Sequence, residues 1–323
     1  MPTTPKPISG IHHVTAICSD PQKNIDFYCR TLGLRLVKLT VNFDDPGSYH
    51  LYYGDELGRP GTAITFFAWP GANRGRIGPP QVSVTAFSVP MDAIDYWRKR
   101  LKERSIEVTA DIERFGQRVL SFSDPDGMRL ELIGVENAQG KPWTSGPVSA
   151  EHAILGFHSV TIAEEGYEKT AKLLTELMGF KPAGTEQNRF RYRAGGGDEF
   201  ASTVDLLCVP DAPHGNLGAG TVHHVAFRTP DDRQQEAWRK EIAQQGWNVS
   251  PIMDRIYFHS IYYREPGGVL FEIATENPGF ALDEPPDRLG TKLMLPPWLE
   301  PYRKNIEAAV PPVRLPGPSK KES

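Results

Sequence analysis

One unit of sequence, an apolar strand followed by an amphipathic helix and further strands, occurs four times in this chain of 323 residues. Three of the four opening strands carry histidine, and the units begin near residues 11, 82, 158 and 224. The predicted helices follow at residues 21–32, 91–103, 166–177 and 233–245. Glycine stands just after three of them, at Gly33, Gly179 and Gly246, as expected where a helix ends in the left-handed conformation. This fourfold repeat predicts an α+β chain built from four βαβββ modules.

The second and fourth units also end alike. A turn signal precedes the last strand of each, at residues 124–127 (Asp-Pro-Asp-Gly) and 265–268 (Glu-Pro-Gly-Gly). A glutamate then stands inside an aliphatic run, Glu131 in the second unit and Glu272 in the fourth. The shared turn and the shared carboxylate argue against chance similarity, and they favour a fixed, inward role for Glu272.

Stretches rich in glycine, proline and serine divide the chain. Residues 139–150 separate the first two units from the last two, and proline becomes dense from residue 277 onward, around a short predicted helix at 298–309. The predicted organisation is a first domain of two modules (8–138), a linker (139–151), a second domain of two modules (152–276) and a proline-rich C-terminal arm (277–323).

The composition limits the classes of partner. Hydrophobic residues make up 39% of the chain and the net charge is −4, without a cluster of Lys and Arg, so we expect no nucleic-acid partner. An apolar run of 18 residues is absent, so we expect no membrane span. Three cysteines (Cys18, Cys29 and Cys208) and the lack of a signal-like start favour the reducing cytoplasm. The composition is compatible with a homo-oligomer and with a monomer.

Adjacent histidines open two of the four units, His12 with His13 and His223 with His224, whereas the third unit has the single His158. Buried charges such as that of Glu272 are normally paired or bound to a metal. Two histidines from separate strands plus one glutamate make a 2-His-1-carboxylate set, which is the ligand arrangement of oxygen-using non-heme iron enzymes.

Paired βαβββ units with histidine in the first strand and glutamate in the last resemble the vicinal oxygen chelate superfamily, which includes glyoxalase I, extradiol dioxygenases and bleomycin-binding proteins. The resemblance covers residues 8–276 and is strongest to the hydroquinone ring-cleaving dioxygenases. The matching stretches are 39–44, 49–55, 58–62 (Gly-Arg-Pro-Gly-Thr), 114–118 (Arg-Phe-Gly-Gln-Arg) and 267–272. The resemblance implies two glyoxalase-like domains with cup-shaped, partly open mixed β-sheets.

Two sets of metal ligands follow from the resemblance. Hydroquinone enzymes imply His13, His224 and Glu272, so that unit one pairs with unit four around the site; catechol enzymes imply His158 in place of His13. We favour the first set, because His-His occurs in units one and four but not in unit three. The remaining Glu131, His158 and Asp205 would form either a second metal site or a polar remnant satisfied internally, and the remnant is favoured.

The resemblance also places five further side chains near the substrate, namely His12, Thr15, His223, Arg255 and Tyr262. Strand alternation puts Thr15 on the face of His13 and His12 on the opposite face, so His12 and His223 need a β-bulge or a rim position to reach a substrate. The alternative is that these two histidines orient their neighbours. Tyr262 could equally be a core aromatic residue, and His50, His152 and His214 are given structural roles.

The implied activity is Fe(II)-dependent extradiol-type cleavage of hydroquinone-like para-diols with O2, with Mn(II) as the alternative metal. The partners are then a small aromatic substrate and O2. The first rival is a glyoxalase I-like metal-dependent isomerase or lyase, which usually has a second glutamate as fourth ligand; residues 63–68 offer no carboxylate there. The second rival, a ligand-sequestering protein of the bleomycin-resistance type, lacks the metal triad.

Overall fold

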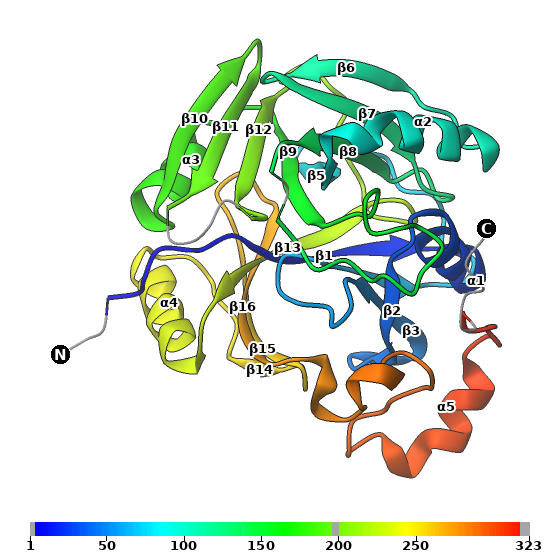
Figure 1. Cartoon of the computed structure of the whole chain (residues 1–323). Helices are drawn as coiled ribbons and strands as arrows, with labels where there is room; N and C mark the ends of the chain where they lie inside the picture. Colours follow the sequence, from blue (N-terminus) through cyan, green and yellow to red (C-terminus); the bar gives the residue numbers. More distant parts are fainter. Residues whose placement is uncertain (1–3, 138, 196–199, 317–323) are drawn as a thin grey trace.

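The computed structural model describes residues 4–137, 139–195 and 200–316, and its core is a pair of curled, eight-stranded mixed sheets (Figure 1). The first sheet has the strand order β14-β15-β16-β13-β1-β4-β3-β2. Its strands are β1 (Ile11–Cys18), β2 (Arg35–Asn42), β3 (Asp45–Gly54), β4 (Ala63–Ala68), β13 (Val222–Thr229), β14 (Met253–Asp254), β15 (Phe258–Arg264) and β16 (Leu270–Pro278).

The second sheet has the order β10-β11-β12-β9-β5-β8-β7-β6. Its strands are β5 (Gln81–Pro90), β6 (Ala110–Arg114), β7 (Gln117–Ser123), β8 (Arg129–Val135), β9 (Gly156–Glu164), β10 (Phe180–Glu186), β11 (Arg189–Ala194) and β12 (Thr203–Cys208). Each sheet therefore combines two repeats. The first and fourth are joined by antiparallel β1 and β13, and the second and third by antiparallel β5 and β9.

The helix of each repeat lies close to its predicted position. The helical segments are α1 with π-helical η1 (Pro21–Ile25 and Asp26–Thr31), η2 with α2 (Met91–Ala93 and Ile94–Glu103), α3 with π-helical η3 (Glu168–Lys172 and Leu173–Leu177), and α4 (Asp232–Gln244). Asp20 caps α1 by accepting from the backbone N–H of Gln22 and Lys23. Gly33 follows with a φ of 74°, which confirms it as a left-handed helix stop.

Strand alternation gives the first sheet two different faces. Val14 and Ala16 of β1 belong to the main hydrophobic core, whereas His13 and Thr15 face a cavity on the concave side. Buried apolar residues cover one end of that concave side, among them Val37, Tyr52, Phe258 and Phe280. One end of the cup is thus packed with apolar side chains.

The segment after β16 closes the packed end of the cup. It forms η4 (Phe280–Leu282), η5 (Pro286–Arg288), η6 (Glu300–Tyr302) and α5 (Arg303–Ala309), and it crosses the first sheet where the Met294 N–H donates to the Leu39 carbonyl at 2.9 Å. The ring of Phe280 lies 5.1 Å from that of Tyr52. A short helix in this arm was predicted and is present; residues 317–323 of the arm lie outside the described part.

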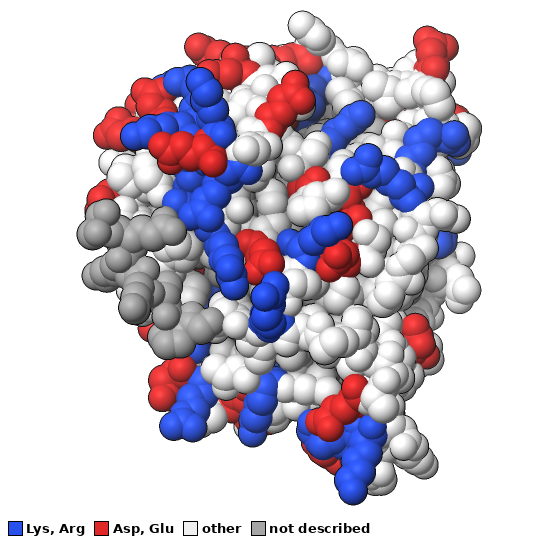
Figure 2. All heavy atoms as spheres, turned by 90° about the vertical axis from the view of Figure 1, so that its right-hand side faces the viewer, with Lys and Arg blue, Asp and Glu red and all other residues white. Residues whose placement is uncertain are grey.

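The surface carries both signs of charge. Figure 2 shows Lys and Arg side chains interspersed with Asp and Glu on one face of the molecule, without a large field of one sign. Among the described residues, the structure contains no helix of the length and apolar character that a membrane crossing requires.

Candidate metal centre

Three buried side chains from three strands converge on the concave side of the first sheet. His13 lies on β1, His224 on the antiparallel neighbour β13, and Glu272 on β16, which runs parallel to β13. Oε2 of Glu272 lies 2.9 Å from Nε2 of His224 and 3.3 Å from Nε2 of His13, and the two nitrogens are 3.4 Å apart. Ligand atoms about 2.1 Å from a metal, at right angles to each other, would be about 3.0 Å apart. The spacing therefore suits one face of an octahedron.

The carboxylate of Glu272 is divided between two environments. Ser260 donates to Oε1, whereas Oε2 is buried and, among the described residues, faces no hydrogen-bonding group other than the two imidazoles. Burial alone would raise the pKa of Glu272, but the two histidines hold this pKa well below its ordinary value. A buried, ionised oxygen without a donor facing two imidazole nitrogens is a donor set that fits a divalent cation such as iron or manganese.

The residues before the two metal-facing histidines fix their rings. The register of β1 against β13 shifts at His12 and again at His223, so each is bulged out of the strand pairing. This places Nδ1 of His12 at 2.9 Å from Nδ1 of His13, and Nδ1 of His223 at 2.8 Å from Nδ1 of His224. Nε2 of His12 must donate to the Thr275 carbonyl at 3.0 Å, so its Nδ1 accepts from His13. The Nε2 lone pair of His13 is then free for a metal.

A narrow cavity adjoins the triad. It is lined by His13, Thr15, Asn42, Phe43, Asp44, His50, Tyr52, Phe67, His224, Arg255, Phe258 and Tyr262. Three of the five predicted substrate-facing residues, Thr15, Arg255 and Tyr262, are thus on its wall. The centres of water molecules can occupy about 30 Å³ of it, which is room for one or two waters.

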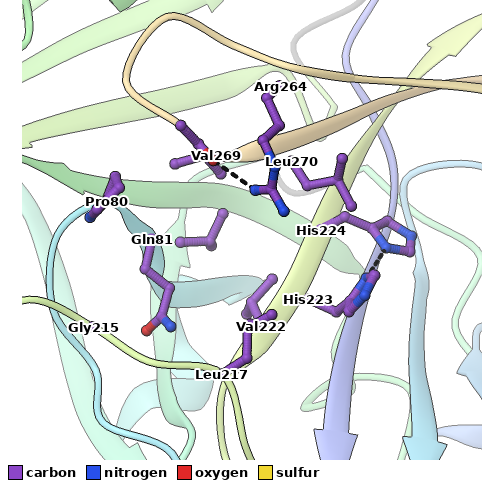
Figure 3. A pocket seen from close by; sticks show the side chains of 12 residues that line it. Pro80, Gln81, Gly215, Leu217, Val222, His223, His224, Arg264, Val269 and Leu270 are labelled. Carbon is purple, nitrogen blue, oxygen red and sulfur yellow. Dashed lines mark hydrogen bonds between the residues drawn. The ribbon is translucent and has the colours of Figure 1, made fainter. Parts of the chain in front are cut away.

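The other two predicted residues lie elsewhere. His12 is buried behind His13, against the ring of Phe258. His223 lines a separate cavity of about 100 Å³, together with residues from both sheets (Figure 3). There its ring contacts His224, and Arg264 donates to the Gly268 carbonyl at 2.8 Å. Each of the two histidines is hydrogen-bonded to the histidine that follows it, as the alternative role of orienting a neighbour requires, and His223 shares its cavity with His224.

Arg255 and Tyr262 form a polar group at the edge of the cavity. Nε of Arg255 donates to the Tyr262 hydroxyl at 3.3 Å, and Nη1 pairs with Asp44 at 3.1 Å. Burial, followed by the charge of Glu272, raises the pKa of Tyr262, so the hydroxyl keeps its proton at neutral pH. The side chain of Asp44 is 65% exposed, so this ion pair stands where the cavity meets solvent.

Sequence reasoning missed His50, which was given a structural role. Its ring lines the cavity and bonds to Thr65 and Tyr52. The sequence pattern that could have indicated its role is that His50 stands two residues before Tyr52 on one strand, which puts both side chains on the same face. It became informative only when β4 was placed between β1 and β3.

In the second sheet, arginine side chains occupy the position that corresponds to the metal centre. Arg114 binds Glu131 through two hydrogen bonds of 2.7 and 3.0 Å, and Arg191 binds Asp205 through bonds of 2.8 and 2.9 Å. The imidazole of His158 bonds to the Ser159 hydroxyl at 3.0 Å, and burial lowers the pKa of His158 to about 3. Across the described residues, His13, His224 and Glu272 are the one group of His, Cys and acidic side chains whose ligand atoms all lie within 4.8 Å of each other.

Comparison with known proteins identifies the family. The sequence model of the Glyoxalase/Bleomycin resistance protein/Dioxygenase superfamily matches residues 10–132 and 156–273. The chain belongs to this superfamily. The match confirms the resemblance read from the repeats, and it leaves the segment between the two pairs of modules uncovered.

Members of the superfamily with high similarity span almost the whole chain. A Bacillus subtilis (strain 168) protein named "Putative ring-cleaving dioxygenase MhqO" is 49% identical over 96% of this chain and 98% of its own length. The "Chlorohydroquinone/hydroquinone 1,2-dioxygenase" of Sphingobium indicum is 38% identical over 92% of this chain and 94% of its own.

Solved structures agree with the architecture. A crystal structure of a "putative dioxygenase" from Bacillus subtilis superposes with a TM-score of 0.92 at 48% identity, covering 96% of this chain and 99% of the other. Glyoxalase I from Zea mays superposes with a TM-score of 0.62 at 16% identity, covering 83% and 92%, which shows a shared fold. The prediction of a glyoxalase-like α+β fold is therefore confirmed.

Proposed function

We propose that this chain is an extradiol-type ring-cleaving dioxygenase that holds Fe(II) through His13, His224 and Glu272 and cleaves hydroquinone-like para-diols with O2. The observation that carries the proposal is the spacing of 2.9–3.4 Å among three buried ligand atoms. The names of both relatives support ring cleavage, and that of the Sphingobium relative supports the substrate class. When bound, the metal would bring ring and O2 together and make a coordinated phenol more acidic.

The wall of the cavity supplies groups that hold a small phenol. The Tyr262 hydroxyl, kept protonated, can donate to a substrate oxygen, and Arg255 adds a positive charge beside it. The rings of Phe67 and Phe258 provide apolar surface for an aromatic ring. Because the cavity holds only one or two waters, we propose that the Asp44–Arg255 pair at its edge must move before a ring can bind.

The rival activities lack support in the site. A glyoxalase-type fourth ligand would come from β4, whose cavity-side residues Ala63, Thr65 and Phe67 carry no carboxylate. A ligand-sequestering protein would not need the triad, and here the triad is intact.

Free thiols at Cys18, Cys29 and Cys208 support a reducing cytoplasmic location.

Oxygen uptake tests the proposed function. Protein loaded anaerobically with Fe(II) or Mn(II) and mixed with hydroquinone, chlorohydroquinone or catechol should consume O2, fastest with the para-diols and with Fe(II). His13→Ala should abolish both metal binding and uptake. His158→Ala, the equivalent change in the second sheet, is the matched control and should leave one metal per chain. Iron-loaded protein that consumes no O2 with any of these diols would refute the proposal, and metal loss in His158→Ala would refute the ligand set.

A further inference from the structure

Four side chains form a continuous hydrogen-bonded chain along the wall of the metal cavity. Oγ1 of Thr15 lies 2.8 Å from Oγ1 of Thr65, which lies 2.9 Å from Nε2 of His50; Nδ1 of His50 lies 2.9 Å from the Tyr52 hydroxyl. Each of these distances is that of a good hydrogen bond. The links therefore run without a gap from a residue two positions after His13 to a tyrosine two strands away.

The strand register produces this chain. Thr15 of β1 pairs with Thr65 of parallel β4, and Thr65 pairs with Tyr52 of antiparallel β3. His50 lies on the same face of β3 as Tyr52, and its ring is held between the rings of Tyr52 and Phe67, with centroids 4.0 and 4.5 Å away. Thr15, His50 and Tyr52 all line the cavity, so both ends of the chain face the place where a substrate would bind.

The chain can exist in two proton arrangements. Burial, followed by the neighbouring His13 and His224, holds the pKa of His50 well below its ordinary value, so the ring is neutral. A neutral imidazole donates through one nitrogen and accepts through the other. In one arrangement every link donates from Thr15 toward Tyr52, and in the other every link donates from Tyr52 toward Thr15. Hydroxyl groups on both sides of the ring adapt to either tautomer.

We infer that Thr15, Thr65, His50 and Tyr52 are a proton relay that removes the proton a phenol loses when it binds in the cavity, with His50 as its central positioning residue. This rests on the proposed function, because it needs a phenolic ligand. The substrate O–H passes its proton to Oγ1 of Thr15, Thr15 passes one to Thr65, and Thr65 passes one to Nε2 of His50. Nδ1 of His50 passes its proton to the Tyr52 oxygen, and Tyr52 releases its own proton to a water in the cavity.

The relay balances without any other reactant. Each of the four side chains gains one proton and loses one, and the chain ends in its opposite arrangement. One proton leaves the substrate oxygen and one appears on water. Reversal of the same steps, after the product has left, restores the first arrangement.

Removal of one hydroxyl in the middle of the chain tests the relay. Thr65→Val keeps the shape of the side chain but breaks the path. Thr40→Val is the matched control, because Thr40 is a buried threonine of β2, paired with His50 in the register, whose Oγ1 has no hydrogen-bond partner among the described residues. His50→Phe breaks the path at the ring, and metal content and thermal unfolding of each variant establish that the site is intact.

Two readouts are compared. In oxygen uptake with hydroquinone, Thr65→Val should lower kcat by about 100-fold or more, the lower end of the range for a lost proton-transfer group, with KM changed less than kcat. In stopped-flow absorbance with 4-nitrophenol and Fe(II)-loaded protein under argon, formation of bound phenolate should slow by a similar factor. Wild type and Thr40→Val should behave alike in both.

The outcomes separate the relay from the proposed function. If Thr65→Val stays within twofold of Thr40→Val in the rate of phenolate formation, the relay is wrong even where the wild type consumes O2. If the wild type consumes no O2 with any diol, the proposed function is wrong, while the phenolate rates still decide on the relay. If His50→Phe does not fold, Thr65→Val gives the decision alone.

Discussion

The hydroxyl of Ser260 donates to Oε1 of Glu272 and leaves Oε2 to face the two imidazoles. Both residues are fully buried, and Ser260 lies on β15, the neighbour of β16. The oxygen that accepts this hydrogen bond is the weaker ligand, so the carboxylate presents its other oxygen to a cation. Ser260 therefore selects a single ligand atom of Glu272, and it should contribute to metal affinity without touching the metal.

Replacement of Ser260 by alanine should weaken Fe(II) binding about 10- to 100-fold, the usual effect of losing a residue that orients a ligand. The measurement is anaerobic competition for Fe(II) with a chelator. Ser121→Ala is the matched control, because Ser121 donates to Oε1 of Glu131 at 3.1 Å in the arginine-filled sheet. Equal affinities in the two variants would contradict the role assigned to Ser260.

His12 gives a second test of ligand orientation. Burial, followed by the charge of His13, lowers the pKa of His12 to about 3, so it stays a neutral acceptor for the His13 N–H at all ordinary pH values. His12→Phe should lower Fe(II) affinity about 10-fold or more, while KM for the diol, measured at saturating Fe(II), stays unchanged. A raised KM with normal metal affinity would instead show that His12 contacts substrate. His152→Ala, a histidine that bonds to Ser149 and stacks on Tyr96, serves as control.

The sequence was sufficient for the architecture because each repeat carries its own signals. Gly33 marks the end of one helix, and the turns before Glu131 and Glu272 mark the last strands, so the elements could be predicted from local chemistry. The convergence of His13 with Glu272 came from the family resemblance. Local patterns give no indication of which repeats pair, since that depends on the contact of β1 with β13, more than 200 residues later.

The features that the sequence left open or did not indicate depend on pairs of strands. Strand alternation places His12 and His13 on opposite faces, and only a bulge brings their nitrogens to 2.9 Å. The connection of His50 to Thr15 requires β4 to lie between their strands. The burial of Lys38 against acids of the C-terminal arm likewise depends on residues far away in the sequence.

A pair of buried glutamates predicts how stability varies with pH. Oγ1 of Thr170 lies within 2.9 Å of both Glu164 oxygens and 2.5 Å from Oε2 of Glu265. One hydroxyl proton cannot serve both carboxylates, so a second proton is needed. The backbone N–H groups of Gly267 and Val269 donate to Glu265. Burial, followed by the charge of Glu265, raises the pKa of Glu164 to about 8, which makes Glu164 the protonated partner.

Replacement of Glu164 by glutamine should therefore stabilise the protein at high pH. A carboxyl with a raised pKa costs nothing below the ordinary value of 4.5, and its cost grows as the pH rises from there toward 8. The Tm of Glu164→Gln minus that of the wild type should increase between pH 5 and pH 8 and then level off, reaching about 2–4 °C. Scanning calorimetry across this range measures it. Glu168→Gln, at an exposed position of α3, should show a flat difference, and a flat difference for Glu164→Gln as well would contradict the protonated state.

The last prediction concerns the arm that closes the cup. Nζ of Lys38 is fully buried, at 2.6 Å from Asp283 and 2.5 Å from Glu284, and Glu284 is itself buried. These ion pairs hold the segment that places Phe280 against Tyr52 and Tyr257. Lys38→Met leaves the Glu284 carboxylate buried without its cation, which should cost about 3–5 kcal/mol of unfolding free energy in urea.

The same substitution should also affect the metal centre, because Phe258 packs between Phe280 and His13, with ring centroids 6.5 and 5.0 Å away. Fe(II) affinity should fall along with stability. The double variant Lys38→Met/Glu284→Gln should recover part of both, since it removes the unpaired charge. Lys23→Met, which breaks an exposed pair with Asp20 at 3.7 Å, should cost less than about 1 kcal/mol. A Lys38→Met protein that unfolds at the wild-type urea concentration would show that hydrophobic packing, rather than the buried ion pairs, holds the arm across the cup.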